Sequence, residues 1–366
     1  MRHGRILAAG WSIFALALFL MLALAIGSGV VGTLVFDAPA LAQRAPDQPA
    51  DALGTGGKSD DWRQIRQGVQ GNVSIPNKQA GVLIQSEGEN WRALRNGPLS
   101  TWGAWVLLGV VAVLALFFAL RGRIKLESGW SGMVIERFNN IDRFTHWLTA
   151  VSFVILALSG LNMLYGRYVL RPIIGAAAFS WLTWIGKLAH NYLAFAFMIG
   201  IVLMFVLWLR ENIPNRYDWQ WIKRGGGFFS KHDHPPAEKF NAGQKLVFWL
   251  VILGGVSVSL SGLALLFPFK FAWFSHTFAF LNIFGLGLPA DLTPLQDTQL
   301  SQIWHAIIGL LMIALIIGHI YIGTIGMEGA FDAMGTGKVD RNWAEEHHQL
   351  WVAEIERRSP ASGDDD

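Results

Sequence analysis

The sequence predicts an all-α membrane protein, in which a four-helix transmembrane bundle follows one extra transmembrane helix and an N-terminal signal or anchor segment. Of the 366 residues, 52% are hydrophobic and 15% are charged, and the mean hydropathy is +0.37. These values are typical of a polytopic membrane protein. Five apolar stretches each have about the 20 residues that a bilayer requires. They cover 101–120, 144–165, 190–209, 246–268 and 303–324.

Residues 1–42 have the features of a segment that directs export. They begin with basic residues, continue in a long apolar run and end in Ala40-Leu41-Ala42. This ending is an A-x-A cleavage pattern, which favours a signal peptide. The apolar run is longer than a usual signal core, so an uncleaved anchor is the alternative. Either way, we expect the next residues to lie outside the cytoplasm.

Residues 43–100 form a polar extracytoplasmic segment. Its first part is rich in Gly, Pro, Gln and Asp and is typical of a disordered linker. The stretch NVSIPNKQAGVLIQ, residues 72–85, is predicted to form a short hairpin. We find no catalytic constellation in this segment.

Loop charges predict the orientation of the helices. The segment 210–245 holds seven Lys or Arg residues, whereas the loop 269–302 holds one and the loop 166–189 holds three. By the positive-inside rule, the extra helix 101–120 ends inside, and residues 121–143 are a cytoplasmic linker. The four-helix domain is 144–327, and the tail 328–366 is cytoplasmic. The two sparsely charged loops are aromatic, so we expect short amphipathic helices at the outer surface.

The composition excludes several kinds of cofactor site and partner. The chain has no cysteine, which excludes disulfides, thiolate nucleophiles, cysteine-bound iron–sulfur clusters and covalently attached c-type haem. The net charge is +3 and the basic residues are spread over several loops, so we predict membrane lipid and no nucleic acid as a partner. A metal centre in this chain would use histidine or oxygen ligands.

Four histidines lie within the predicted membrane helices. His305 and His319 are fourteen residues apart in one apolar helix, which is about 21 Å along its axis and returns to within about 40° of the same face. His190 begins its span on the outer side, and His146 lies near the inner end of its own helix. The depths therefore predict an outer pair, His190 with His305, and an inner pair, His146 with His319.

These pairs predict two six-coordinate b-type haems, one toward each membrane surface. Bundle cores build cofactor sites from facing helices, and neutral imidazole is a strong axial ligand of haem iron. Small residues would leave room for the flat porphyrin; these are Gly160, Ala194, Gly262 and Gly309. The alternative for any one histidine is a simple interhelical hydrogen bond, but ionisable residues inside a membrane are costly and usually functional.

The remaining histidines lie in other surroundings. We expect solvated loop positions for His232, His234, His347 and His348, because no matching ligand set accompanies them. His276 is expected at the outer surface, and His3 belongs to the signal region.

Several segments together resemble a known family. They are NNIDRFTHW, ENIPNRYDWQW, KFNAGQKLVFW, IWHAIIGLLMIALIIGHIY and GKVDRNWAEEHHQLW. They resemble the gamma subunit of membrane-bound, quinone-linked formate dehydrogenases, a dihaem cytochrome b. The resemblance covers about residues 137–356, with all four histidines in matching places. It does not cover residues 1–136, whose role stays open.

The resemblance implies a place in an electron-transfer chain. A molybdenum- or tungsten-containing alpha subunit would oxidise formate, and a beta subunit with iron–sulfur clusters would pass electrons to the outer haem. They would then reach the inner haem and a quinone near the cytoplasmic face of a bacterial inner membrane. The resemblance does not fix the oligomeric state, and a higher oligomer is one of the alternatives.

The same resemblance points to the quinone site. It implies that Asn241, Gly243 and Gln244 line the pocket beside the inner haem, together with His319. Amide side chains can hydrogen-bond a quinone carbonyl, and glycine permits close approach. The alternative is that Asn-Ala-Gly only caps the helix that starts near Gln244.

Two other functions remain open at this point. One is the same dihaem design in a nickel–iron hydrogenase or a thiosulfate reductase, which predicts the same spectrum with a different partner. The other is a haem-free membrane anchor or transporter, which predicts no b-type absorption bands.

Overall fold

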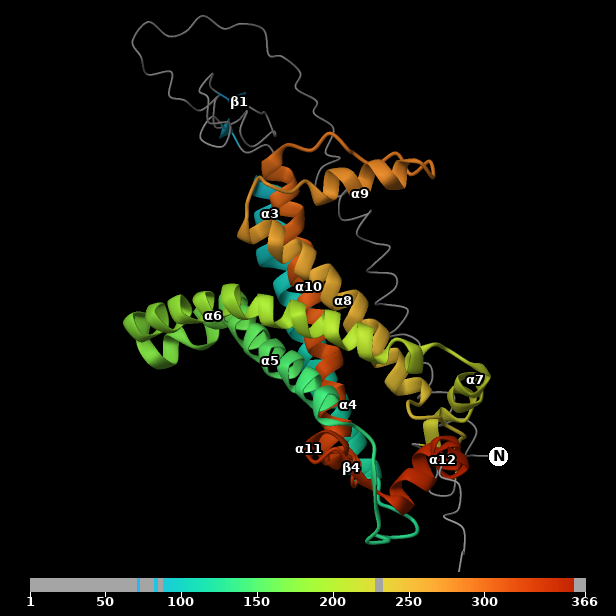
Figure 1. The fold of residues 1–366 in the computed structure, drawn as a ribbon. Helices are drawn as coiled ribbons and strands as arrows, with labels where there is room; N and C mark the ends of the chain where they lie inside the picture. Colours follow the sequence, from blue (N-terminus) through green and yellow to red (C-terminus); the bar gives the residue numbers. More distant parts are fainter. Residues whose placement is uncertain (1–70, 73–81, 85–87, 228–232, 359–366) are drawn as a thin grey trace, which may run out of the picture. The chain divides into compact units, whose positions relative to one another are not determined.

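The computed structural model describes residues 71–72, 82–84, 88–227 and 233–358, and it confirms the all-helical membrane class (Figure 1). Five helical segments of these ranges are long and apolar enough to cross a membrane: Asn90–Arg121, Asn140–Val169, Arg171–Trp208, Ala242–Leu266 and Pro294–Gly326. The signal or anchor predicted at residues 1–42 lies outside the described residues, as do His3 and His232.

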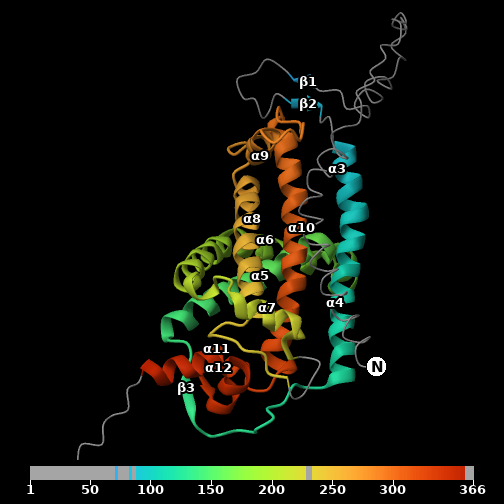
Figure 2. The same cartoon turned by 90° about the vertical axis from the view of Figure 1, so that its right-hand side faces the viewer.

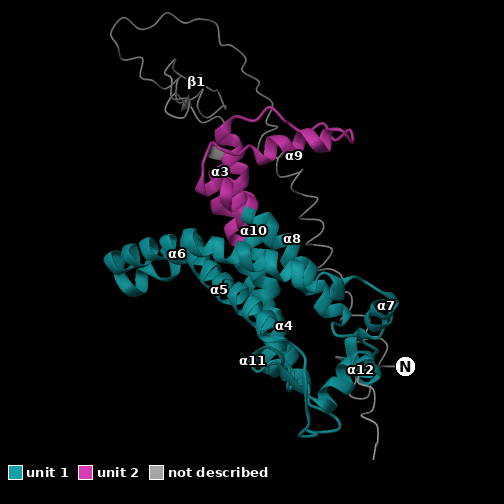
Figure 3. Cartoon of the chain, viewed as in Figure 1, with its two compact units in different colours: residues 1–19, 104–259, 308–366 teal, residues 20–103, 260–307 magenta. Residues whose placement is uncertain are grey.

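The chain divides into two compact units (Figure 3). Unit 1 contains residues 104–259 and 308–358 of the described chain. Unit 2 contains the described residues up to 103 together with 260–307. Helices α4 (Ser100–Arg121), α8 (Ala242–Leu266) and α10 (Pro294–Tyr321) each contribute residues to both units.

In unit 1, helices α5 (Asn140–Val169) and α6 (Arg171–Trp208) follow one another as a helical hairpin. Asn139 caps α5 in a reciprocal box with Asp142, which satisfies donors that the first helical turn leaves free. Gly200 allows α6 to approach Thr149 closely, since a Cβ there would lie 3.2 Å from the Thr149 Cα. The hairpin is therefore closely packed at this crossing.

The segment 166–189, predicted as a loop with a short helix, lies largely within helix α6. We expected a short helix within 166–189 and a new span from His190, whereas α6 already begins at Arg171. Pro172 sits in the first turn, where proline is tolerated. Gly175, with φ 80° and ψ 168°, is a non-helical kink that separates this first turn from a second helix, which runs through FSWLTWIG without a break. His190 consequently lies well inside α6.

Five short elements form one end of unit 1, which we call the α12 end (Figure 2). Strand β3 (Val134–Glu136) pairs antiparallel with β4 (Lys338–Asp340). They are accompanied by α7 (Arg216–Lys223), α11 (Asp332–Gly335) and α12 (Arg341–Arg358). Their core includes Val339, Trp343 and Trp351, all nearly inaccessible. The segments predicted as linker and tail are thus ordered against each other.

The extra helix predicted at 101–120 is present as α4. Its last turns lie in unit 1, where the rings of Phe117 and Phe118 each meet Tyr321 edge-on at 6.4 Å. Beyond the helix, Ile124 forms a bridge to Met327, next to the π-helical turn η4 (Ile322–Gly326). The end of α4 is therefore attached to the end of α10.

Unit 2 contains the predicted hairpin. Strand β1 (Gly71–Asn72) pairs antiparallel with β2 (Val82–Ile84), which confirms that prediction. The unit also holds α3 (Gly88–Leu94) and η1 (Arg95–Leu99). A short helix in the loop 269–302 is confirmed as α9 (Trp273–Asn282), which packs through Phe278 on Leu288 and Leu300.

Candidate haem sites

His146 of α5 and His319 of α10 face each other in unit 1. Their ring centroids are 6.2 Å apart and the ring planes are inclined by 55°. A metal–imidazole bond is about 2 Å long, so two such bonds on opposite sides of one ion, plus half of each ring, separate the centroids by about 6 Å. The observed spacing therefore fits one iron held between the two rings.

In the described part of the chain, the surroundings of this pair leave a ring nitrogen without a partner and space for a cofactor. The Nδ1 atom of His146 is buried and has no hydrogen-bond partner among the described residues. His319 is exposed, and no atom lies within 4 Å of the place that a Cβ would take at the neighbouring Gly318. Trp147 stands edge-on to His146 at 5.2 Å and is fixed by a hydrogen bond to the Met334 carbonyl. These features fit a planar group bound beside the rings.

His190 is held by α5 within unit 1. The Ser159 hydroxyl lies 2.8 Å from its Nδ1, and a Cβ at Gly160 would lie 3.6 Å from its Cε1. A histidine whose Nδ1 is hydrogen-bonded coordinates a metal through Nε2. The ring is half-buried.

His305 has the same neighbours within unit 2. The Ser261 hydroxyl lies 3.1 Å from its Nδ1, and a Cβ at Gly262 would lie 3.3 Å from its Cε1. The sequence analysis singled out both glycines but missed both serines. The signal was a repeat, because LSGL occurs at 158–161 and again at 260–263.

The structure thus brings together the predicted inner pair. His190 and His305 belong to different units, and each is described within its own unit, so their pairing stays a prediction. Farther along α10, no atom lies within 4 Å of a Cβ built on Gly309, which agrees with the space expected there.

The NAGQK segment forms a helix cap. The Asn241 backbone N–H donates to the Gln244 side chain, and the Gln244 N–H donates to the Asn241 side chain, both at 3.0 Å. Gly243 lies against Trp221, since a Cβ there would be 2.9 Å from the indole. The capping alternative is therefore confirmed, and the quinone role stays a prediction.

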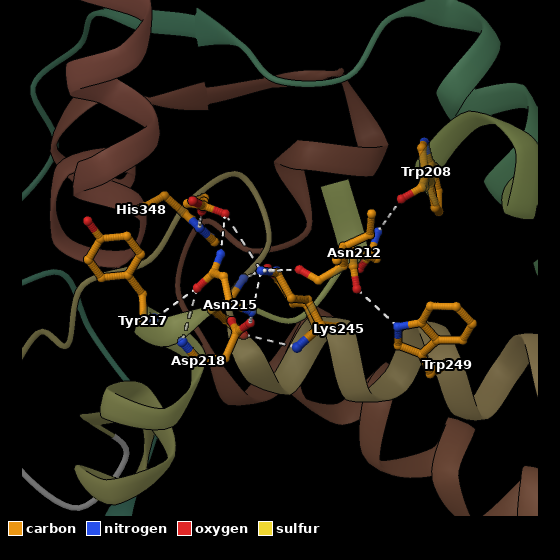
Figure 4. A network of polar contacts seen from close by, with 12 residues as sticks. Trp208, Asn212, Asn215, Tyr217, Asp218, Lys245, Trp249 and His348 are labelled. Carbon is orange, nitrogen blue, oxygen red and sulfur yellow. Dashed lines mark hydrogen bonds and ion pairs between the residues drawn. The ribbon is translucent and has the colours of Figure 1, made fainter. Parts of the chain in front are cut away.

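A buried ion network follows this cap (Figure 4). Lys245 is 3% exposed; its ammonium group donates to Asp218 at 3.0 Å and to the Ile213 carbonyl at 3.2 Å. Glu238 lies 3.6 Å away and also accepts from Asn215 at 2.6 Å. The network ties the start of α8 to α7.

Replacing Lys245 by methionine is expected to destabilise the protein by about 1–3 kcal/mol, because it removes a buried ammonium group that donates to the half-buried Asp218 and to the Ile213 carbonyl. The free energy of unfolding in detergent measures this loss. Arg358→Met is the matched control, since it breaks an exposed pair with Glu354 and should cost about 0–1 kcal/mol. Equal losses in the two variants would contradict the assignment.

The expectation that the C-terminal histidines are solvated is wrong for His348. This residue is 1% exposed, and its Nδ1 donates to the Glu238 carbonyl at 2.6 Å. Its backbone, with φ −147° and ψ 43°, interrupts α12, and the ring packs on Trp343 at 5.3 Å. Burial lowers the pKa of His348 well below its usual value. The packing of α12 on distant segments could not be read from a local pattern.

The two neighbouring histidines also make specific contacts. His347 is half-buried, and burial lowers its pKa to about 4, so the ring is neutral at pH 7. His234 donates from Nε2 to the Glu127 carboxylate at 3.0 Å, and its ring centroid lies 6.2 Å from that of His347. His276 is exposed, as expected.

Arg137 is a buried residue that the sequence analysis missed. It is 4% exposed, and its guanidinium lies 5.1–5.4 Å from the rings of Phe138, Trp343 and Trp351. Burial lowers its pKa to about 9. It also donates to the Lys239 carbonyl, so it joins the start of α5 to α12 and to the chain before α8.

Long apolar helices with two facing histidines are the features that a membrane cytochrome b requires. The model of the prokaryotic cytochrome b561 family matches residues 137–337, which is more than half of the chain. The chain belongs to this family. All four histidines of the predicted pairs fall within the matched region.

Curated relatives are similar over the same part of the chain. The cytochrome b556(Fdn) subunit of the nitrate-inducible formate dehydrogenase of Escherichia coli K12 is 28% identical over 232 residues, 61% of this chain and 93% of the relative. The cytochrome b556(fdo) subunit of the same organism is 26% identical, covering 61% and 94%. A formate dehydrogenase cytochrome b556 subunit of Haemophilus influenzae is 22% identical, covering 60% and 83%.

Proposed function

We propose that this chain is the membrane electron-transfer subunit of a formate dehydrogenase complex. The observation that carries the proposal is the 6.2 Å spacing of the His146 and His319 rings, in a family of cytochromes b whose similar members are named as formate dehydrogenase subunits. The partners would be an iron–sulfur subunit and a molybdenum- or tungsten-containing catalytic subunit. Formate oxidation itself would take place in the catalytic partner.

Four imidazoles would hold two b-type haems. His146 and His319 would coordinate the inner one, and His190 and His305 the outer one. Haem iron supplies one-electron transfer between its two oxidation states. The chain's own contribution is to fix the ring orientations, as Ser159 and Ser261 do, and to exclude water with apolar helices.

The orientation of the chain in the membrane follows from charge. The α12 end carries the basic segments, so we place it in the cytoplasm of a cell with the chain in its inner membrane. Electrons would enter outside and move inward. Moving one charge against 100 mV costs about 2.3 kcal/mol, which the donor must supply. Proton uptake from the cytoplasm by the reduced quinone would then add to the membrane potential.

The quinone would bind beside the inner pair, at Asn241, Gly243, Gln244 and His319. The capping box uses the oxygen atoms of both amides, so their NH₂ groups are the donors for a quinone carbonyl. The Lys245 network holds this helix start in place. Capping and quinone binding are therefore compatible in the same residues.

Gln244→Glu separates the two roles. It keeps an oxygen for the Asn241 N–H but removes the amide donor, so reoxidation of the reduced cytochrome by a quinone analogue should slow by roughly tenfold, the value of one hydrogen bond of about 1.4 kcal/mol. Stopped-flow absorbance measures this rate. Gln220→Glu, on the exposed face of α7, is the control. An unchanged rate would place the pocket elsewhere.

Reduction of the native complex tests the proposed function as a whole. Purified with its companion chains, the complex should show b-type bands that formate reduces and quinone reoxidises. Reduction by hydrogen and not by formate would instead support a hydrogenase subunit. Absence of b-type bands would leave a haem-free anchor.

A further inference from the structure

We propose that Ser159 and Ser261 are positioning residues that select the iron-binding nitrogen of His190 and His305 and lower the reduction potential of the iron held there. The inference rests on the proposed function and deepens it, because it gives electron transfer a direction. It is carried by two Ser–His contacts, one in each unit, at 2.8 and 3.1 Å.

Proton accounting at Ser159 fixes the tautomer of His190. The Ser159 hydroxyl lies 2.7 Å from the Ile155 carbonyl and 3.0 Å from the Leu156 carbonyl. A hydroxyl has one proton, and carbonyls only accept, so the proton points to the backbone. Toward His190 the same oxygen therefore acts as an acceptor. The His190 Nδ1 carries the hydrogen, and Nε2 keeps the lone pair that iron requires.

The second contact repeats the first in sequence and geometry. Ser261 follows Leu260 and precedes Gly262, just as Ser159 follows Leu158 and precedes Gly160. In each case the serine oxygen lies at Nδ1 of a histidine, and the glycine lies nearest its Cε1. One LSGL element thus positions one imidazole.

His146, of the proposed inner pair, differs at the same atom. His146 Nδ1 is buried and has no hydrogen-bond partner within the described ranges. A hydrogen bond at the outer nitrogen makes a metal-bound imidazole more basic. A more basic ligand favours ferric over ferrous iron and lowers the potential. The haem at His190 and His305 should therefore be the weaker oxidant, so that electrons pass from it to the haem at His146 and His319.

A redox titration of the haem-loaded full-length chain tests the inference. Ser159→Ala should raise the reduction potential of one of the two optical components. The expected rise is at most about 59 mV, which corresponds to a tenfold change in the ferrous-to-ferric ratio for one electron. Ser261→Ala should raise the same component. Ser159→Thr keeps a hydroxyl and should restore the potential. The g values of one low-spin ferric signal should change with the alanine variants.

Matched controls lie on the same helices. Ser152 bonds the Leu148 and Thr149 carbonyls at 2.6 and 3.1 Å, the same backbone pattern as Ser159. On α8, Ser259 bonds the Gly255 carbonyl at 2.6 Å. Ser152→Ala and Ser259→Ala should leave both potentials unchanged.

Three results would overturn the inference. Shifts no larger than those of the controls would show that the serines are structural only. If the two serine variants shift the potentials of different haem components, His190 and His305 do not bind the same iron. Two haems with unchanged potentials would overturn this inference and leave the proposed function intact, whereas a chain without haem would overturn both.

Discussion

Replacing His146 or His319 by alanine is expected to remove one haem and to retain the other. The two ring centroids lie 6.2 Å apart, which fits our proposal that both imidazoles would bind the same iron. Loss of either imidazole would leave that haem with a single protein ligand. The haem-to-protein ratio of the purified chain, measured as the pyridine haemochromogen, should fall by half.

The control and the double variant make this result specific. His276→Ala removes an exposed imidazole and should leave the ratio unchanged. The double variant His146→Ala/His319→Ala should lose no more haem than either single variant. Loss of both haems in the double variant would show that the two rings serve different irons.

The second large effect is expected at His190 and His305. Either alanine variant should lose the outer haem and keep the inner one, and formate-driven quinone reduction by the complex should stop. His305 and His319 are fourteen residues apart, so an electron entering outside would face about 21 Å without a carrier. The single variants should show the intact absorption of the inner haem after reduction with dithionite.

A double variant tests the pairing that the structure leaves open. His190→Ala/His305→Ala should hold one haem, as each single variant does. A chain with no haem in this double variant, together with one haem in each single variant, would contradict the outer pair.

The membrane helices were predictable because a bilayer imposes a length and a composition. All five predicted spans correspond to helices, and the depth of His146 and His319 placed them together. The extent of α6 was not predictable, because after the kink at Gly175 no signal separates the predicted loop from the span that contains His190. Helix existence follows from hydropathy, whereas helix ends depend on local signals.

The polar contacts of the site were less visible in the sequence. A serine in an apolar helix commonly donates to a carbonyl of its own helix, as Ser159 does to Ile155. Because this bond already satisfies the hydroxyl, there was no reason in the sequence to expect the further contact with His190. The repeated LSGL was the only clue. For Asn241 and Gln244, the spacing predicted the cap that the structure shows.

The α12 end depended on contacts between distant segments. Ser131 bonds Asp340 across 209 residues, and β3 pairs with β4 over a similar separation. Such long-range packing buries His348 and Arg137, although both lie in polar stretches of the sequence. A polar local sequence predicts an exposed side chain only where no distant segment packs over that residue.

Low-temperature paramagnetic resonance of the oxidised full-length chain tests the central claim most directly. If imidazoles bind iron porphyrin from both sides at two depths, the spectrum should contain two low-spin ferric signals, each integrating to one spin per chain. A single signal, or high-spin iron at either site, would contradict it.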